Sequence, residues 1–141
     1  MPRLAFPLLL LVLLLGGCSS IDTQVDQNKQ LHQVQRFFVL ANPSDSRAID
    51  RHIVNALRAH GLTAESGPRT MMPDDTQAMI HYVDNWTWDF GDRLVYLQIR
   101  VRDLRSGEPL GTMEYAAKIP GRQPVARVVS DLVDRLFGPA K

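Results

Sequence analysis

The residues best suited to chemistry lie in one short stretch, HYVDNWTWDFGDR, from His81 to Arg93. It holds both tryptophans of the chain and three aspartates, Asp84, Asp89 and Asp92. Carboxylates brought together in a pocket can act as a general acid and base, and exposed aromatic rings can stack on a ligand. Whether either role is open depends on where the surrounding elements place these side chains.

Two strands joined by a turn account for this stretch. Alternating apolar and polar residues predict strands over residues 78–88 and 93–104. A four-residue loop between them pairs Trp88 with Arg93 and gathers the large apolar residues of both strands on one face. A five-residue loop would instead bury three polar side chains, at about 1–3 kcal/mol each if unpaired: His81, Asn85 and Thr87. The four-residue loop therefore predicts that both tryptophans pack in the core, beneath the helices.

Asp84 is the one carboxylate on this apolar face. A structural interpretation pairs it with a backbone amide, or with Arg47 or Arg51 of a predicted helix. A functional interpretation makes it a carboxylate of raised pKa that works with Asp89 or Asp92. We favour the structural interpretation, because an unpaired buried carboxylate is costly.

The other face of the two strands is polar, which is typical of a face in contact with solvent. Tyr96, Arg100 and Arg102 share it, and the two guanidinium groups could meet an anionic partner. With Asp84, these three residues form the set of candidate binding residues.

Several classes of site are not indicated. The sequence has no GxSxG, P-loop or HExxH motif and no cysteine besides Cys18. His52 and His60 are eight positions apart, whereas a helical metal pair usually needs four. We therefore expect no catalytic residue, no metal and no cofactor.

The order of predicted elements is β-α-(β)-β-β-β-α, with a short second strand around residues 63–66 that the pattern leaves ambiguous. The first helix follows a turn capped by Ser44 or Asp45 and ends at Gly61. The last helix carries the apolar stripe from Val125 to Phe137. We expect an α+β fold, an antiparallel sheet of about four strands with two helices packed on one face.

The N-terminal segment is typical of an exported protein. Arg3 precedes an apolar run of 12 residues from Leu4 to Leu15, too short to span a bilayer, so residues 1–17 are predicted to be a signal peptide. Without it, the chain has 15 basic and 15 acidic residues, a balance that excludes a general nucleic-acid-binding surface. Residues 18–35 are polar and are predicted to form a flexible tether to a single domain over residues 36–138.

Leu15-Gly16-Gly17-Cys18 resembles the lipobox of bacterial lipoproteins. The resemblance implies that Cys18 becomes lipidated, and Ser19 after it implies sorting to the outer membrane. With the element order, the stretch Y-x-D-x-W-x-W-D from Tyr82 and R-D-L-R-S-G from Arg102, the chain resembles a family of small proteobacterial outer-membrane lipoproteins with a compact α/β domain. That family has no agreed activity, so no catalytic residue is carried over.

These observations predict a lipid-anchored protein of the outer membrane that faces the periplasm. We expect a non-enzymatic binding or assembly accessory module, with a protein partner in the envelope reached through the polar sheet face or an edge strand. The alternative is a small hydrolase or glycan-active enzyme that depends on Asp84. A pocket in which carboxylates converge would favour the enzyme, and a flat sheet face the binding module.

Overall fold

The computed structural model describes residues 30–88, 90–117 and 123–140. The predicted signal peptide and Cys18 lie outside these residues. The elements, in chain order, are η2 (Leu31–Gln33), β1 (Arg36–Leu40), α2 (Ile49–Ala59), β2 (Thr63–Gly67), η3 (Arg69–Met71), β3 (Ala78–Trp88), β4 (Asp92–Asp103), β5 (Pro109–Ala116) and α3 (Val125–Phe137). No helix in this part of the chain has the length and apolar character needed to span a membrane.

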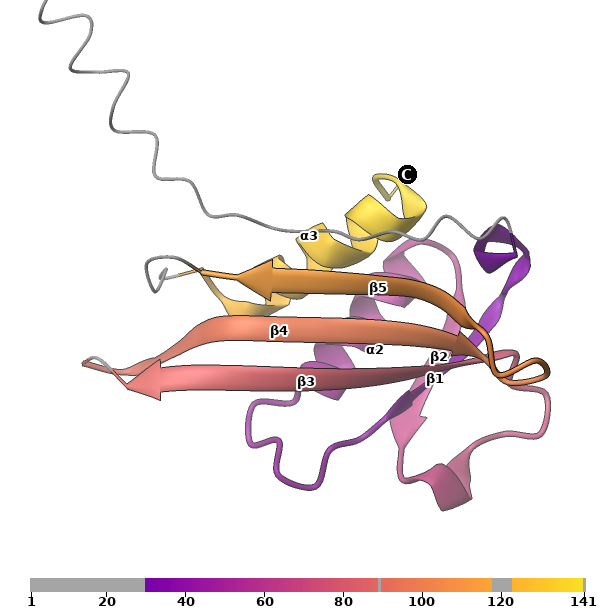
Figure 1. Ribbon diagram of the computed structural model, residues 1–141, viewed down its shortest axis with the longest axis horizontal. Helices are drawn as coiled ribbons and strands as arrows, with labels where there is room; N and C mark the ends of the chain where they lie inside the picture. The colour runs from indigo at the N-terminus through magenta and orange to yellow at the C-terminus, as the bar shows by residue number, and fades with distance from the viewer. Residues whose placement is uncertain (1–29, 89, 118–122, 141) are drawn as a thin grey trace, which may run out of the picture.

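The five strands form one mixed sheet in the order β2-β1-β3-β4-β5, with α2 and α3 packed on one face (Figure 1). The α+β class and the two helices were predicted, but a sheet of about four antiparallel strands was not correct. β1 pairs in parallel with both β2 and β3. The ambiguous segment after the first helix is a full strand, because α2 is a crossover that returns the chain parallel to β1.

The start of α2 is bonded to the sheet through Asp45. Its carboxylate accepts hydrogen bonds from the amides of Arg47 and Ile49, both at 2.7 Å, and from the Tyr82 hydroxyl at 2.9 Å. Burial alone would raise the pKa of Asp45, but these hydrogen bonds lower it overall. Burial raises the pKa of Tyr82, and its hydrogen bond to Asp45 adds to the rise. The N-cap residue is Ala48, not Ser44 or Asp45 as predicted. Asp45 still accepts a hydrogen bond from the first amide of α2 and fixes the helix to β3.

The two helices contact one another and the sheet closely. His60, directly after α2, and Asp134 of α3 lie 2.8 Å apart, Nε2 to Oδ1. Gly111 in β5 lies directly beneath α3, where an added Cβ would be 3.0 Å from Cδ1 of Leu136. The missing side chain of Gly111 lets α3 pack close to β5.

The folded domain begins before the predicted boundary at residue 36. Leu31 is only 2% exposed and Val34 only 6%, and both belong to the core cluster. The tether predicted over residues 18–35 is therefore wrong for its last residues. The segment is polar overall, so its two apolar residues, Leu31 and Val34, did not indicate a folded element. They are three positions apart, and the single turn of η2 brings both to the core.

The pairing of β3 with β4 follows the predicted register over most of its length. Ile80 pairs with Val101 and Asp84 pairs with Leu97. The register then shifts between Asn85 and Trp86, so that Trp88 pairs with Asp92 instead of Arg93. The predicted four-residue loop is wrong, because an irregularity within the strands takes up one residue.

Candidate functional site

The open face of the sheet, which neither α2 nor α3 covers, carries a group of basic side chains that we call the basic cluster. It consists of His81 on β3, Arg100 and Arg102 on β4, and Arg69 on η3. His81 and Arg100 are direct partners in the register. Partial burial and the charges of Arg102, Arg69 and Arg100 lower the pKa of His81. Each of the three arginines is thus close enough to His81 for its charge to act on the imidazole.

None of the three arginines of the basic cluster has a carboxylate within 4.0 Å among the described residues, where the ion pairs are Arg36–Asp75, Arg47–Asp92 and His60–Asp134. A pocket of about 400 Å³ adjoins the cluster. His81, Arg100 and Arg102 line it together with Gln98 and Thr112. Positive charge without an acidic partner, beside an open pocket on a rigid sheet, can bind an anion.

Tyr96 lies on the same face, as predicted, but at its acidic end. Its hydroxyl donates to Glu114 on β5 at 3.0 Å, and the Gln98 side-chain amide donates to the same carboxylate oxygen. Burial, then the hydrogen bond to Glu114, raise the pKa of the Tyr96 hydroxyl. Tyr96 therefore helps to hold Glu114 in place, and it does not line the pocket beside the basic cluster.

Asp84 has a structural partner that the sequence did not suggest. Its Oδ2 accepts a hydrogen bond of 2.6 Å from Nε1 of Trp86, and neither Arg47 nor Arg51 pairs with it. Arg47 instead lies over the Trp86 ring, 4.1 Å from its centroid, and forms an ion pair of 2.5 Å with Asp92.

The aspartates proposed for the enzymatic alternative do not converge in the described structure. Asp84 is engaged by the Trp86 indole and Asp92 by Arg47, while Asp89 lies outside the described residues. Asp92 lines a groove of about 760 Å³ between the hairpin and the start of α3, and Asp84 does not.

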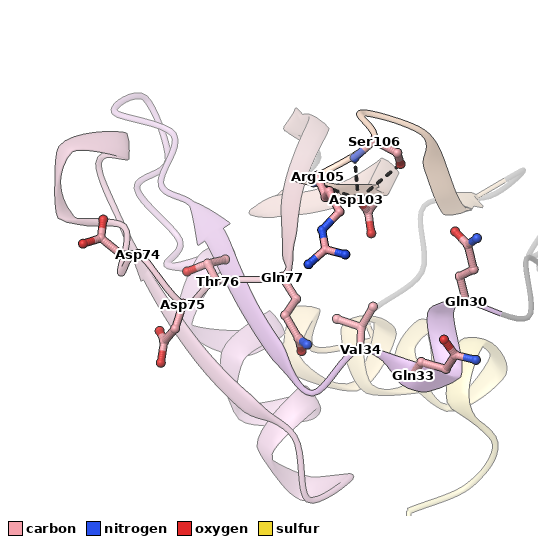
Figure 2. Close-up of a pocket in the computed structure, with 10 residues that line it drawn as sticks. All are labelled: Gln30, Gln33, Val34, Asp74, Asp75, Thr76, Gln77, Asp103, Arg105 and Ser106. Atoms are coloured by element: carbon pink, nitrogen blue, oxygen red, sulfur yellow. Dashed lines mark hydrogen bonds between the residues drawn. The ribbon is translucent and has the colours of Figure 1, made fainter.

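A second set of carboxylates lines the pocket of about 610 Å³ drawn in Figure 2, and these too have separate functions. Asp75 forms an ion pair of 2.7 Å with Arg36. Asp103 accepts hydrogen bonds from the amides of Ser106 and Arg105, which lower its pKa and shape the turn before β5. No group of three or more His, Cys, Asp or Glu side chains that could hold a metal occurs in the described part of the chain.

The two tryptophans have different environments. Trp86 is half-buried and packs against the core, whereas Trp88 is 76% exposed and Phe90 is 95% exposed. The prediction of two core tryptophans is therefore wrong for Trp88. Alternation correctly predicted the face of Trp86. β3 and β4 extend past the ends of both helices (Figure 1), so neither helix covers the last residues of β3.

Two members of the basic cluster were missed by the sequence analysis. His81 could have been found, because the predicted register already pairs it with Arg100. Arg69 could not, because its position depends on how the segment after β2 folds back. A Cβ atom at Gly67 would lie 3.6 Å from Cζ of Phe38 and 3.7 Å from Cβ of Met71, so η3 packs close over β1 at that glycine.

We expect Asp84→Asn to lower the free energy of unfolding by about 1–2 kcal/mol. The amide oxygen can still accept the Trp86 hydrogen bond, but the bond loses its charge assistance. Chemical denaturation of the purified variant measures this, with Asp74→Asn, at an exposed loop aspartate, as the control. A variant of unchanged stability that has lost its cellular function would instead identify Asp84 as a working acid or base.

Comparison with known proteins gives a fold and no family. No protein-family model and no curated protein matches the chain. A variant of PelC from Paraburkholderia phytofirmans, solved as a dodecamer, has 13% identity, with 76% of this chain and 88% of that chain covered and a TM-score of 0.55. A second PelC dodecamer from that organism has 13% identity and a TM-score of 0.51, and the match covers 77% of this chain and 88% of that chain. A PDZ domain protein from Parabacteroides distasonis has 12% identity and a TM-score of 0.50, and the match covers 83% of this chain and 34% of that chain.

Proposed function

We propose that this chain is a lipid-anchored, non-enzymatic binding module on the periplasmic side of the outer membrane. The basic cluster on the open sheet face would bind an anionic group of another envelope component. The observation that carries this proposal is the set of three arginines beside His81 with no carboxylate within ion-pair distance in the described structure. The lipobox at Cys18 supports the location.

The three arginines of the basic cluster carry positive charge that no described carboxylate offsets at ion-pair distance. Partial burial and the charges of Arg102, Arg69 and Arg100 lower the pKa of His81, so a proton on His81 is repelled by the neighbouring cations. An anion bound among them would relieve that repulsion and receive charge-assisted hydrogen bonds from guanidinium groups, which match carboxylate and phosphate geometry. The sheet supplies a fixed base, because His81, Arg100 and Arg102 all project from strands inside it.

The arrangement of carboxylates supports binding over catalysis. An enzyme of the alternative class needs Asp84 and a second carboxylate at one pocket. Here Trp86 engages Asp84 and Arg47 engages Asp92, and each aspartate contributes to holding the base of the β3-β4 hairpin. The open face offers a broad polar surface instead, of the kind that a macromolecular partner can cover.

We expect the double variant Arg100→Glu/Arg102→Glu to lose affinity for an anionic probe by at least tenfold, since each charge-assisted hydrogen bond contributes about 1.5–3 kcal/mol. The probe is a sulfated oligosaccharide, and the measurement is titration calorimetry on the mature protein. The matched control is Arg127→Glu/Arg135→Glu, which makes the same charge change at exposed positions of α3. Equal losses in both double variants would show that only net charge matters and would contradict the proposed site.

His81 supplies a second measurement on the same site. Its pKa is lowered by partial burial and by the neighbouring arginines, and a bound anion would raise it again. Binding is therefore coupled to proton uptake, and affinity should increase as the pH falls through the range in which His81 titrates. The probe keeps its sulfate charges throughout. His81→Asn should remove this pH dependence while retaining binding at neutral pH.

A further inference from the structure

The tip of the β3-β4 hairpin exposes two aromatic side chains to solvent. Trp88 and Phe90 are among the few exposed large hydrophobic residues in the described structure. Their ring centroids are 6.5 Å apart and the ring planes are tilted by 31°. The two rings thus form one small apolar surface, which we call the aromatic tip, where the β3-β4 hairpin turns. The hairpin projects from one end of the domain (Figure 1).

The backbone at the aromatic tip adds a second observation. Phe90 has a φ of 53°, a left-handed conformation that is rare and unfavourable for a bulky side chain. Such strain is retained where the surrounding structure or a function requires it. Here the strained residue is also the most exposed large apolar side chain, at 95%, so no internal packing compensates for the strain.

The base of the aromatic tip is held firmly. Trp86 lies two residues before Trp88 on the same strand, hydrogen-bonded to Asp84 and covered by Arg47. Arg47 also neutralises Asp92, which pairs with Trp88 across the hairpin. Asp92 is thus offset by a cation. Asp89, which lies between the two aromatic residues in the sequence, restricts the tip to the polar interfacial region of a membrane, because a carboxylate is costly in the hydrocarbon core.

We propose that the aromatic tip inserts into the interfacial region of the lipid bilayer to which the chain is anchored. Tryptophan favours this region, because its ring is apolar and its N–H can reach headgroups and water. The tip is also too small for a stable protein interface. Two aromatic side chains offer about 400 Å² in total, whereas a typical interface buries about 800 Å² on each partner.

The anchor and the aromatic tip can reach the membrane together. The tip and η2 lie at opposite ends of the domain (Figure 1). Eleven residues separate Cys18 from Gln30, and a chain of this length spans about 40 Å when extended. β3 has eleven residues and is about 36 Å long at the usual rise of a strand. The tether is therefore long enough for the domain to lie along the surface with its far end inserted.

The test uses tryptophan fluorescence of the mature protein in phosphatidylcholine vesicles whose acyl chains carry bromine, which quenches only at membrane depth. We expect wild-type emission to fall in brominated vesicles, and the Trp88→Phe variant, which retains only Trp86, to be little affected. Phe90→Ser should reduce the membrane-inserted fraction. Loss of even about 60 Å² of buried apolar surface, less than half of what one aromatic side chain offers, lowers an insertion equilibrium about tenfold.

The matched control is Val83→Ser, which removes an exposed apolar side chain in the middle of β3 and should leave quenching unchanged. Emission that is quenched by iodide in solution but not by brominated lipid would show that the tip faces water. Protection from both quenchers would place the tip in a protein contact. Either result would overturn the proposal. The vesicles are zwitterionic, so failure of the basic cluster as an anion site would not alter the result.

Discussion

Phe38→Ala should lower the free energy of unfolding by about 3–5 kcal/mol, the usual range for a large aromatic removed from a packed site. Phe38 is only 1% exposed although it projects toward the open side of the sheet, where η3 covers it. A loss of this size is a large fraction of the stability of a small domain. Equilibrium denaturation in urea measures it.

The Phe38 variant should also weaken the basic cluster, because η3 carries Arg69. Phe38→Leu keeps most of the apolar volume and should retain both stability and anion binding better than the alanine variant. Val83→Ala provides the control on the open face, since Val83 is 56% exposed and should change stability by no more than about 0.5 kcal/mol. If Phe38→Ala unfolded at the same urea midpoint as this control, η3 would not bury Phe38 in solution.

Cys18→Ser should abolish lipid attachment. The lipobox requires the thiol of Cys18 for attachment of lipid, and the chain has no other cysteine that could replace it. Without acyl chains, the stable anchor is lost, because several acyl chains are needed to hold a protein at a membrane. Labelling with a radioactive or clickable fatty acid, followed by membrane fractionation, measures both effects.

The control for the lipidation experiment is Ser20→Ala, which lies two residues beyond the cysteine and should label normally. Continued acyl labelling of Cys18→Ser would contradict the assignment of the anchor. The aromatic tip contributes far less than several acyl chains, so it should not retain the unlipidated protein stably at the membrane.

The strand pattern predicted which residues share a face, and it did so from local alternation alone. The helix-side positions of Ile80, Tyr82 and Asp84 and the open-face positions of Arg100 and Arg102 all follow from it. The register shift at Asn85 was not predictable, because one extra residue in a strand does not change the apolar-polar alternation of the residues that precede it.

The remaining differences depend on contacts between distant segments. The exposure of Trp88 depends on where the helices end relative to the sheet, which the pattern of one strand does not contain. The burial of Leu31 depends on the chain folding back over the core from a polar segment. The distant residue Arg47 was expected to pair with Asp84, but it contacts the Trp86 ring and Asp92 instead. The partner of Asp84 is therefore Trp86, a neighbour on its own strand.

The position of β1 also determines how the domain would respond to a mechanical load. A pull on the proposed lipid anchor at Cys18 would enter the described fold at η2 and reach Arg36, the first residue of β1. β1 is an interior strand, bonded in parallel to β2 over five residue pairs and to β3 over three. Force along its axis loads these backbone hydrogen bonds together in shear, whereas a pull across an edge strand would break them one at a time. The domain is thus attached to its tether at a point that resists extension.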